Sequence, residues 1–374
     1  MERIKETYMT RAQRINGRGV LSALAGVALV ALALALAACG GSNASATTTS
    51  ADTMLGAGST FAAPLYTKWA SDYQGVAGVK LNYQAVGSSA GIAAIEAKTV
   101  DCGATDAPLS AADLQSNGLV QFPTMIGGAV PVLNVSGIAS GVLKLDGPTL
   151  ADIFLGKITT WNDPAIAKLN PGMKLPSTAI NVVHRSDGSG TSWMFTSYLS
   201  AVSPAWNSQV GANTTPTWPV GTGAKGSSGV AALVQQIDGS IGYVEYTYAK
   251  QNGMNSAQLE NADGVFVKPS LSAFAAAATM ASWKPSEGFA LPLVNEPGAE
   301  SWPITGASYI LMQKDQQDAA RAGMALKFFD WAYTNGAQTA SSLDYVPIPA
   351  KVYKLVEKVW QQQVTVSGTS VWPQ

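Results

Sequence analysis

The sequence predicts an α/β fold whose mostly parallel sheets carry helices on both faces. Apolar or alternating stretches typical of strands take turns with helical patterns along most of the chain, which is the order that crossover helices produce. Three of the turns from strand to helix are rich in glycine, serine and threonine. The part after residue 51 has about 320 residues, which is enough for two lobes with cores of their own.

Residues 1–38 are predicted to be an export signal that takes no part in the fold. Basic residues precede an uncharged apolar run over 20–38, and small residues stand immediately before Cys39. The Leu-Ala-Ala-Cys ending resembles the bacterial lipoprotein signal, in which Cys39 becomes the lipidated first residue. The alternative is a retained membrane helix, since about 20 apolar residues span a bilayer. The small residues at the cleavage position favour the lipoprotein.

The next segment, 39–51, is small, polar and repetitive, which is typical of a flexible tether. The signal holds five of the 23 basic and two of the 24 acidic residues, so 18 basic and 22 acidic residues remain, a net charge near −4. This charge excludes a general nucleic-acid surface. With Cys39 acylated, Cys102 has no partner for a disulfide. One histidine, His184, argues against a zinc site, and we expect neither metal nor cofactor.

Two units of strand, turn and helix open the folded part. A strand at 53–55 leads through the turn 56–61 into a helix that carries apolar residues at four-residue spacing. A strand at 79–86 leads through the turn 87–91 into a helix at 92–97. The next strand, 100–109, ends in an acidic loop that contains Asp106.

A long apolar stretch, 125–135, is predicted to be a strand that crosses between the lobes, with Gly127 and Gly128 as a hinge. Later strands are predicted at 179–183, 241–246 and 308–312. Later helices are predicted at 149–159, 193–199, 230–237, 272–280, 317–334 and 350–363.

The third glycine-rich turn, 184–192, lies between a buried strand and a helix and begins with His184 and Arg185. Glycines allow a ligand to approach the backbone closely, and the first N–H groups of a helix have no partner within it. These donors and the helix dipole favour an anion. Arg185 adds a forked, permanently charged donor that matches an oxyanion. The turn therefore predicts a site for a small anion.

One such turn alone is better explained by a tight turn into a capped helix, whereas three in one chain indicate a shared anion. Asp106 suits only an anion that carries a proton, because a carboxylate accepts a hydrogen bond from P–OH but repels a fully ionised oxyanion. Phosphate keeps a proton at neutral pH and sulfate does not, so Asp106 would select phosphate. Asp187 can hold Arg185 in place. The alternatives are a loop carboxylate for Asp106 and a turn or capping residue for Asp187.

Two other functions were considered. The turn 87–91 fits the G-x-S-x-G pattern of a hydrolase elbow with Ser89 as nucleophile, and His184 follows later in the chain. This hypothesis depends on the one histidine, which lies beside Arg185 and suits a structural role. The stretch 221–228 fits a P-loop only in part, because Lys225 precedes its last glycine. A receptor for another oxyanion such as sulfate is the second alternative.

Eight segments resemble the substrate-binding proteins of bacterial high-affinity phosphate ABC importers. They occur in the same order as in that family: Gly-Ala-Gly-Ser-Thr-Phe (56–61), Gly-Ser-Ser (87–89), Asp-Ala-Pro-Leu-Ser (106–110), Phe-Pro-Thr (122–124), Leu-Gly-Lys-Ile (155–158), Asp-Gly-Ser-Gly-Thr-Ser (187–192), Ile-Gly-Tyr-Val-Glu-Tyr (241–246) and Lys-Phe-Phe-Asp-Trp-Ala-Tyr (327–333). The resemblance runs from residue 56 to about 345.

This resemblance implies a two-lobed periplasmic-binding-protein fold of type II, with the ligand in the cleft between the lobes. Lobe 1 would comprise 52–127 and 299–374, and lobe 2 would comprise 128–298. The resemblance assigns phosphate binding to Thr60, Phe61, Ser88, Asp106, Arg185, Ser189, Gly190 and Thr191, with Asp187 in support of Arg185.

The resemblance also implies a receptor without catalytic activity. It would be lipid-anchored through Cys39 at the periplasmic or cell-envelope face of a membrane. It would deliver inorganic phosphate to the permease subunits of an ABC importer with a cytoplasmic ATPase.

Overall fold

The structure, a computed structural model, describes residues 53–373. The predicted signal, the tether and Cys39 lie outside the described residues. Residues Ser50–Gln374 form one compact unit, and the fold below is that of this unit. No helix among the described residues has the length and apolar character that a membrane span requires.

Parallel strands joined by crossover helices form the first part of the main sheet. β1 (Thr53–Gly58) pairs in parallel with β2 (Lys80–Ala85) and with β3 (Cys102–Thr105). The connecting helices are α1 (Ala63–Ala77) and α2 (Ser88–Glu96). The order of the predicted strand–turn–helix units is confirmed, and α1 buries the apolar residues whose spacing predicted it. The predicted turn 87–91 is mostly wrong, because α2 begins at Ser88 directly after Gly87.

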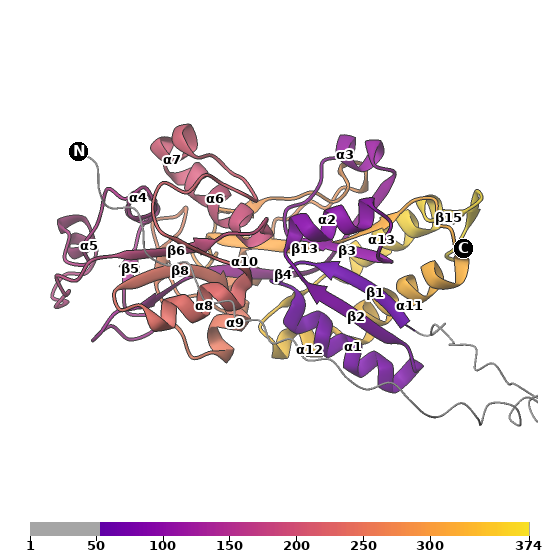
Figure 1. The fold of residues 1–374 in the computed structure, drawn as a ribbon, viewed down its shortest axis with the longest axis horizontal. Coiled ribbons are helices and arrows are strands. Elements are labelled where there is room, and N and C mark those ends of the chain that lie inside the picture. Colours follow the sequence, from indigo (N-terminus) through magenta and orange to yellow (C-terminus); the bar gives the residue numbers. More distant parts are fainter. Residues whose placement is uncertain (1–52, 374) are drawn as a thin grey trace, which may run out of the picture. The chain divides into compact units, whose positions relative to one another are not determined.

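One long strand, β4 (Leu119–Asn134), passes from the first part of the sheet into the second (Figure 1). Its residues 119–128 pair antiparallel with β13 (Ile304–Gln313), and its residues 129–134 pair antiparallel with β8 (Ser240–Glu245). The predicted crossing strand is confirmed, but it begins six residues earlier than the apolar pattern indicated. The earlier residues include Pro123, which is accommodated where the register with β13 shifts.

The second part of the main sheet continues from β8 through β6 (Asn181–Arg185) to β7 (Thr222–Ala224), and both of these pairings are parallel. The remaining strands are β5 (Lys144–Leu145), β9 (Asn255–Ser256), β10 (Gln258–Glu260), β11 (Phe266–Val267), β12 (Leu293–Val294), β14 (Val346–Pro347), β15 (Thr365–Val366) and β16 (Thr369–Ser370). β11, β10 and β5 form a separate small sheet, and β15 pairs with β16.

The later helices α8 (Gly226–Gln236), α10 (Leu271–Ala277), α11 (Ala319–Asn335) and α13 (Ala350–Gln363) confirm predicted helices within a few residues. α6 (Gly190–Val202) is longer than predicted, and α4 (Gly147–Phe154) is shorter because Gly156 adopts a left-handed conformation. Short helices were not predicted: α3 (Ala111–Ser116), α5 (Pro164–Leu169), α7 (Pro204–Gln209), α9 (Tyr246–Gln251), α12 (Ala337–Ser342) and the 3₁₀ turn η1 (Pro285–Glu287).

The prediction of mostly parallel sheets is wrong, because β4 and β13 make the main sheet mixed. A crossover helix makes parallel only the two strands that it joins. β4 and β13 are separated by the whole middle segment of the chain and run antiparallel to each other. The architecture is that of two α/β lobes.

Aromatic side chains pack on both sides of the crossing. Phe122 of β4 lies 5.2 Å from Trp360 and 5.5 Å from Phe329 between ring centroids. In the other lobe, Phe195 stacks on Tyr243 at 4.3 Å. Each lobe therefore has apolar packing of its own, as the chain length indicated.

Gly91 is a position where the packing of α2 against the sheet can be tested. A Cβ atom there would lie 2.5 Å from Gly58 Cα and 2.7 Å from the Ala104 carbonyl oxygen, so α2 would have to move away from β1 and β3. We expect Gly91→Ala to lower the free energy of unfolding by about 1–3 kcal/mol in urea denaturation.

Gly75→Ala is the matched control, because a Cβ at this helical position in α1 would meet nothing within 4 Å. It should raise the free energy of unfolding by about 0.5–1 kcal/mol. A Gly91→Ala protein as stable as the unchanged chain would show that α2 does not depend on this close approach.

Candidate functional site

The three glycine-rich turns meet between the lobes. The backbone N–H of Gly190, at the start of α6, donates to Ser88 Oγ at 3.0 Å. Arg185 Nη1, at the end of β6, donates to Thr60 Oγ1 at 3.1 Å. Residues more than 100 positions apart in the sequence thus contact each other at helix starts and strand ends, as the pattern of turns predicted.

Gly87 shows why this convergence needs glycine. Its φ of 97° is strained for any residue with a side chain. A Cβ there would also lie 2.7 Å from Asp187 Oδ2 and 2.8 Å from the Gly188 carbonyl oxygen of the other lobe. Any larger residue would therefore separate the turn of Ser88 from the turn of Arg185.

Arg185 is 3% exposed, and Asp187 holds it in a two-bond pair. Nε donates to Asp187 Oδ1 at 2.7 Å and Nη2 donates to Oδ2 at 2.5 Å. The backbone N–H of Gly226 also donates to Oδ1 at 3.0 Å. Burial alone would raise the pKa of Asp187, but the hydrogen bonds and charge of Arg185 outweigh it and leave the pKa lowered. The pair fixes the guanidinium and leaves Nη1 directed at Thr60.

Asp106 follows β3 and is 1% exposed. Ser59 Oγ donates to its Oδ1 at 2.6 Å, and Ser88 Oγ lies 3.4 Å from Oδ2. Burial raises the pKa of Asp106 to about 6, although the hydrogen bond from Ser59 and the charge of Arg185 act in the opposite direction. At neutral pH the group is mainly a carboxylate, so it accepts hydrogen bonds and repels a fully ionised anion.

The start of α6 supplies further donors. Ser189 Oγ caps the helix by accepting from the N–H of Ser192 at 3.1 Å, while the N–H of Ser189 donates to the Thr214 carbonyl oxygen at 2.9 Å. Thr191 Oγ1 is buried and has no hydrogen-bond partner among residues 53–373. A buried hydroxyl without a partner is costly, so Thr191 is available to a ligand.

Phe61 is fully buried at the turn before α1. Its carbonyl oxygen accepts from the Tyr345 hydroxyl at 2.7 Å. This contact fixes the backbone of the turn between β1 and α1, where Ser59 and Thr60 also lie.

Sequence reasoning missed three residues, of which Ser59 and Ser227 contact predicted residues directly and Glu245 contacts Ser227. Ser59 donates to Asp106, and Ser227 Oγ lies 3.1 Å from Thr60 Oγ1. Ser227 in turn donates to the fully buried Glu245 at 2.7 Å. One signal could have identified Glu245: it is the last residue of an apolar strand, in the way that Asp106 directly follows β3.

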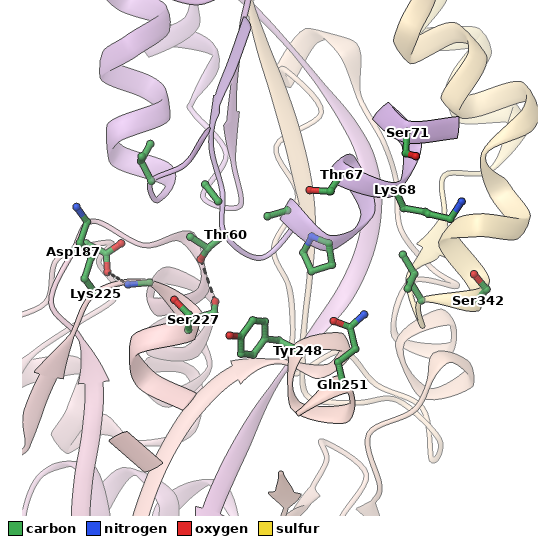
Figure 2. Close-up of a pocket in the computed structure, with 17 residues that line it drawn as sticks. Thr60, Thr67, Lys68, Ser71, Asp187, Lys225, Ser227, Tyr248, Gln251 and Ser342 are labelled. Atoms are coloured by element: carbon green, nitrogen blue, oxygen red, sulfur yellow. Dashed lines mark hydrogen bonds between the residues drawn. The ribbon is translucent and has the colours of Figure 1, made fainter. Parts of the chain in front are cut away.

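A cavity of about 760 Å³ lies beside the site. Figure 2 shows Thr60 and Ser227 facing each other at its wall, with Asp187 and Lys225 nearby. Tyr248, Gln251, Thr67 and Ser342 line the opposite part. Ser88, Asp106 and the start of α6 are not part of this lining, so the cavity borders the site only on the side of Thr60 and Ser227.

Ser89 and His184 do not form the nucleophile–base pair that the hydrolase hypothesis requires. Ser89 Oγ donates to Thr214 Oγ1 at 3.3 Å, and His184 Nδ1 lies 3.0 Å from the Arg185 carbonyl oxygen while its ring stacks on Trp218 at 4.8 Å. Burial lowers the pKa of His184. Within residues 53–373, no hydrogen bond joins Ser89 to His184, and no group of three or more His, Cys, Asp or Glu side chains is arranged to hold a metal. Cys102 is a buried free thiol whose pKa burial raises.

The Arg185–Asp187 pair makes a stability test possible. We expect Asp187→Asn to lower the free energy of unfolding by about 3 kcal/mol at pH 7, because it leaves a buried guanidinium without its counter-charge. The lowered pKa of Asp187 implies stability that is present above its unfolded pKa, near 3.8, and is lost as the pH falls through the folded value. Urea denaturation at pH 7 and below pH 4 measures both effects.

Asp152→Asn is the matched control, because Asp152 pairs with Lys157 at the exposed surface. It should change the free energy of unfolding by less than about 1 kcal/mol. Equal losses in the two variants would mean that burial of the Arg185 pair has no special weight.

Comparison with known proteins identifies the family. The family model for the PBP superfamily domain matches residues 43–335. The phosphate-binding protein PstS of Xylella fastidiosa is 51% identical over 308 residues, which are 82% of this chain and 85% of the relative. PstS of Pasteurella multocida is 51% identical over 328 residues, which are 87% of this chain and 95% of the relative.

A solved structure supports the fold. The high affinity periplasmic phosphate-binding protein PfluDING, bound with phosphate, superposes with a TM-score of 0.67 at 21% identity and covers 85% of this chain and 97% of its own. The sequence relatives and the family model together are sufficient for an assignment. The chain belongs to the PBP superfamily and, within it, to the family of the phosphate-binding proteins PstS.

Proposed function

We propose that this chain is an extracytoplasmic receptor that binds inorganic phosphate and delivers it to an ABC import complex, without chemistry of its own. The observation that carries the proposal is that one site holds both a buried cation and a buried carboxylate acceptor. Arg185 is a buried, oriented cation, and Asp106 is a buried acceptor fixed by Ser59 close to Ser88. Donors alone suit any oxyanion, whereas a carboxylate among them favours an oxyanion that carries a proton. The relatives at 51% identity are named phosphate-binding proteins.

The predicted residues would supply phosphate with three kinds of group: a charged donor, neutral donors and one acceptor. Arg185 gives charged donors and is held by Asp187. Thr60, Phe61 and Ser88 give hydroxyl and backbone donors from lobe 1. Ser189, Gly190 and Thr191 give donors from the start of α6 in lobe 2. Asp106 accepts the phosphate proton.

Closure of the lobes completes this site. The hydrogen bonds from Arg185 to Thr60 and from Gly190 to Ser88 join residues on the two sides of the crossing strand. We place the boundaries at 52–127 and 299–374 for lobe 1 and at 128–298 for lobe 2. The partner change of β4 after Gly128 supports a hinge there. Hydrogen bonds to a charged ligand contribute about 1.5–3 kcal/mol each, so an ion held by both lobes favours the closed form.

The proposal also includes export and a lipid anchor at Cys39. Residues 1–38 would direct export, and Cys39 would carry a lipid that anchors the receptor to a membrane at the periplasmic or cell-envelope face. The receptor would then dock on permease subunits whose cytoplasmic partner hydrolyses ATP. The support is the pattern of basic residues, apolar run and small residues before the cysteine.

Calorimetric titration of the ligand-stripped protein at neutral pH tests the ligand. We expect tight binding of phosphate and none of sulfate. Asp106→Asn should weaken phosphate binding about 10- to 100-fold, because it removes one charge-assisted hydrogen bond to the ion. Asp238→Asn, at an exposed carboxylate of lobe 2, is the control and should bind like the unchanged chain. Equal binding of phosphate and sulfate, or of neither, would contradict the role of Asp106.

The hydrolase alternative is tested by Ser89→Ala. We expect no turnover of an aryl phosphate or an aryl acetate by either protein, since Ser89 bonds to Thr214 and not to His184. Phosphate affinity should change less than about fivefold, because the loss of one neutral hydrogen bond at 3.3 Å costs less than about 1 kcal/mol. Turnover that disappears in Ser89→Ala while anion binding persists would establish the hydrolase instead.

A further inference from the structure

Glu245 is a fully buried carboxyl group at the end of β8. Its Oε2 accepts a hydrogen bond from Ser227 Oγ at 2.7 Å, and its Oε1 has no hydrogen-bond partner among the described residues. No ion pair joins it to a cation there. Burying an ionised carboxylate with one hydrogen bond costs free energy of folding, so a functional role would account for Glu245 at this position.

A chain of hydroxyl groups connects Glu245 to Arg185. Arg185 Nη1 donates to Thr60 Oγ1 at 3.1 Å, and Thr60 Oγ1 lies 3.1 Å from Ser227 Oγ. Figure 2 shows the contact between Thr60 and Ser227 at the wall of the cavity. Because each hydroxyl carries one proton, each can donate in one direction only.

The protonation of Glu245 therefore sets the direction of the whole chain. An ionised carboxylate only accepts, so Ser227 donates to Glu245 and Thr60 donates to Ser227. Thr60 then presents only lone pairs to the anion site. A Glu245 that carries its proton on Oε2 donates to Ser227, Ser227 donates to Thr60, and the Thr60 proton is free to point at an anion.

We propose that Glu245 is a positioning residue that takes up one proton when phosphate binds and thereby turns the Thr60 hydroxyl into a donor to the ion. The inference rests on the proposed function of the same site. The proton comes from solvent and forms an O–H bond with the Glu245 carboxylate. The hydroxyls of Ser227 and Thr60 only rotate about their C–O bonds and exchange no proton.

The surroundings of Glu245 place its protonation near pH 8, so proton uptake on binding occurs mainly above that pH, where the carboxyl group of the free protein is ionised. Burial raises the pKa of Glu245 to about 8, with the bond from Ser227 and the charge of Arg185 acting against it and the charge of Asp106 adding to it. Tyr345 and Tyr248 also face this region, and their raised pKa values keep them neutral. A bound anion brings further negative charge and favours the protonated form. Ser227 lines the cavity and so connects Glu245 to the outside.

The test is phosphate titration of the full chain between pH 6 and pH 9.5, with Glu245→Gln alongside. The glutamine amide is uncharged and has an NH₂ donor for Ser227 at every pH, so it imitates the protonated acid. The dissociation constant of the unchanged chain, divided by that of the variant, should rise about tenfold from pH 7 to pH 9. The reason is that the fraction of the unchanged chain with a protonated Glu245 falls about tenfold over this range. The titrations of phosphate itself and of Asp106 affect both proteins and cancel in the ratio.

Calorimetry in two buffers of different ionisation enthalpy at pH 8.5 gives an independent readout. The unchanged chain should take up about three quarters of a proton more per phosphate than Glu245→Gln does. Ser227→Ala, which interrupts the chain and leaves Glu245 in place, should bind phosphate with a weaker pH dependence than the unchanged chain. This comparison does not use Glu245→Gln, so it decides the matter if that variant fails to fold. The control is Glu300→Gln at an exposed glutamate, which should follow the unchanged chain.

Identical pH profiles and identical proton uptake in the unchanged chain and in Glu245→Gln would overturn the proposal. The same holds for a Ser227→Ala protein that keeps the full pH dependence. Absence of phosphate binding in every protein at every pH would be a different result, because it would refute the proposed function and this inference with it.

Discussion

The structure depends on one strand that belongs to both lobes. β4 is buried along almost its whole length and changes partner from β13 to β8 after Gly128. Its backbone groups pair within one lobe up to Gly128 and within the other lobe after it, so one continuous strand joins the two lobes at the point where its partner changes. This shared strand keeps the ends of β3 and β6 opposite each other, and the carboxylate of Asp106 and the guanidinium of Arg185 lie at those ends.

The site combines charges that oppose one another. Arg185 is oriented by Asp187, while Asp106 and Glu245 are buried carboxyl groups without such a pair. Burial raises the pKa of both, and it raises that of Glu245 further because Glu245 has fewer donors. A receptor with one paired cation and two unpaired acids favours a ligand that carries both negative charge and a proton. Inorganic phosphate has this chemistry at neutral pH.

Much of the fold and of the site could be predicted from local patterns. Alternating strands and helices, the apolar spacing in α1 and the glycine-rich turns are set by neighbours within a few residues. The mixed sheet could not be predicted in this way, since the direction of β13 relative to β4 depends on how the chain returns after the middle segment. The six-residue helices were missed because one turn and a half is too short for a periodic pattern.

The sequence by itself determined which residues are candidates for the site: one arginine at the start of a glycine-rich turn, a carboxylate at the end of a strand, and hydroxyls at helix starts. Tertiary structure alone decided that Ser227 and Glu245 join them, through contacts that span 167 and 18 residues. The reason is that a turn or a cap is a local free-energy minimum that the sequence encodes directly. The direction of a hydroxyl chain depends instead on groups that only the packing of two lobes brings within hydrogen-bond distance.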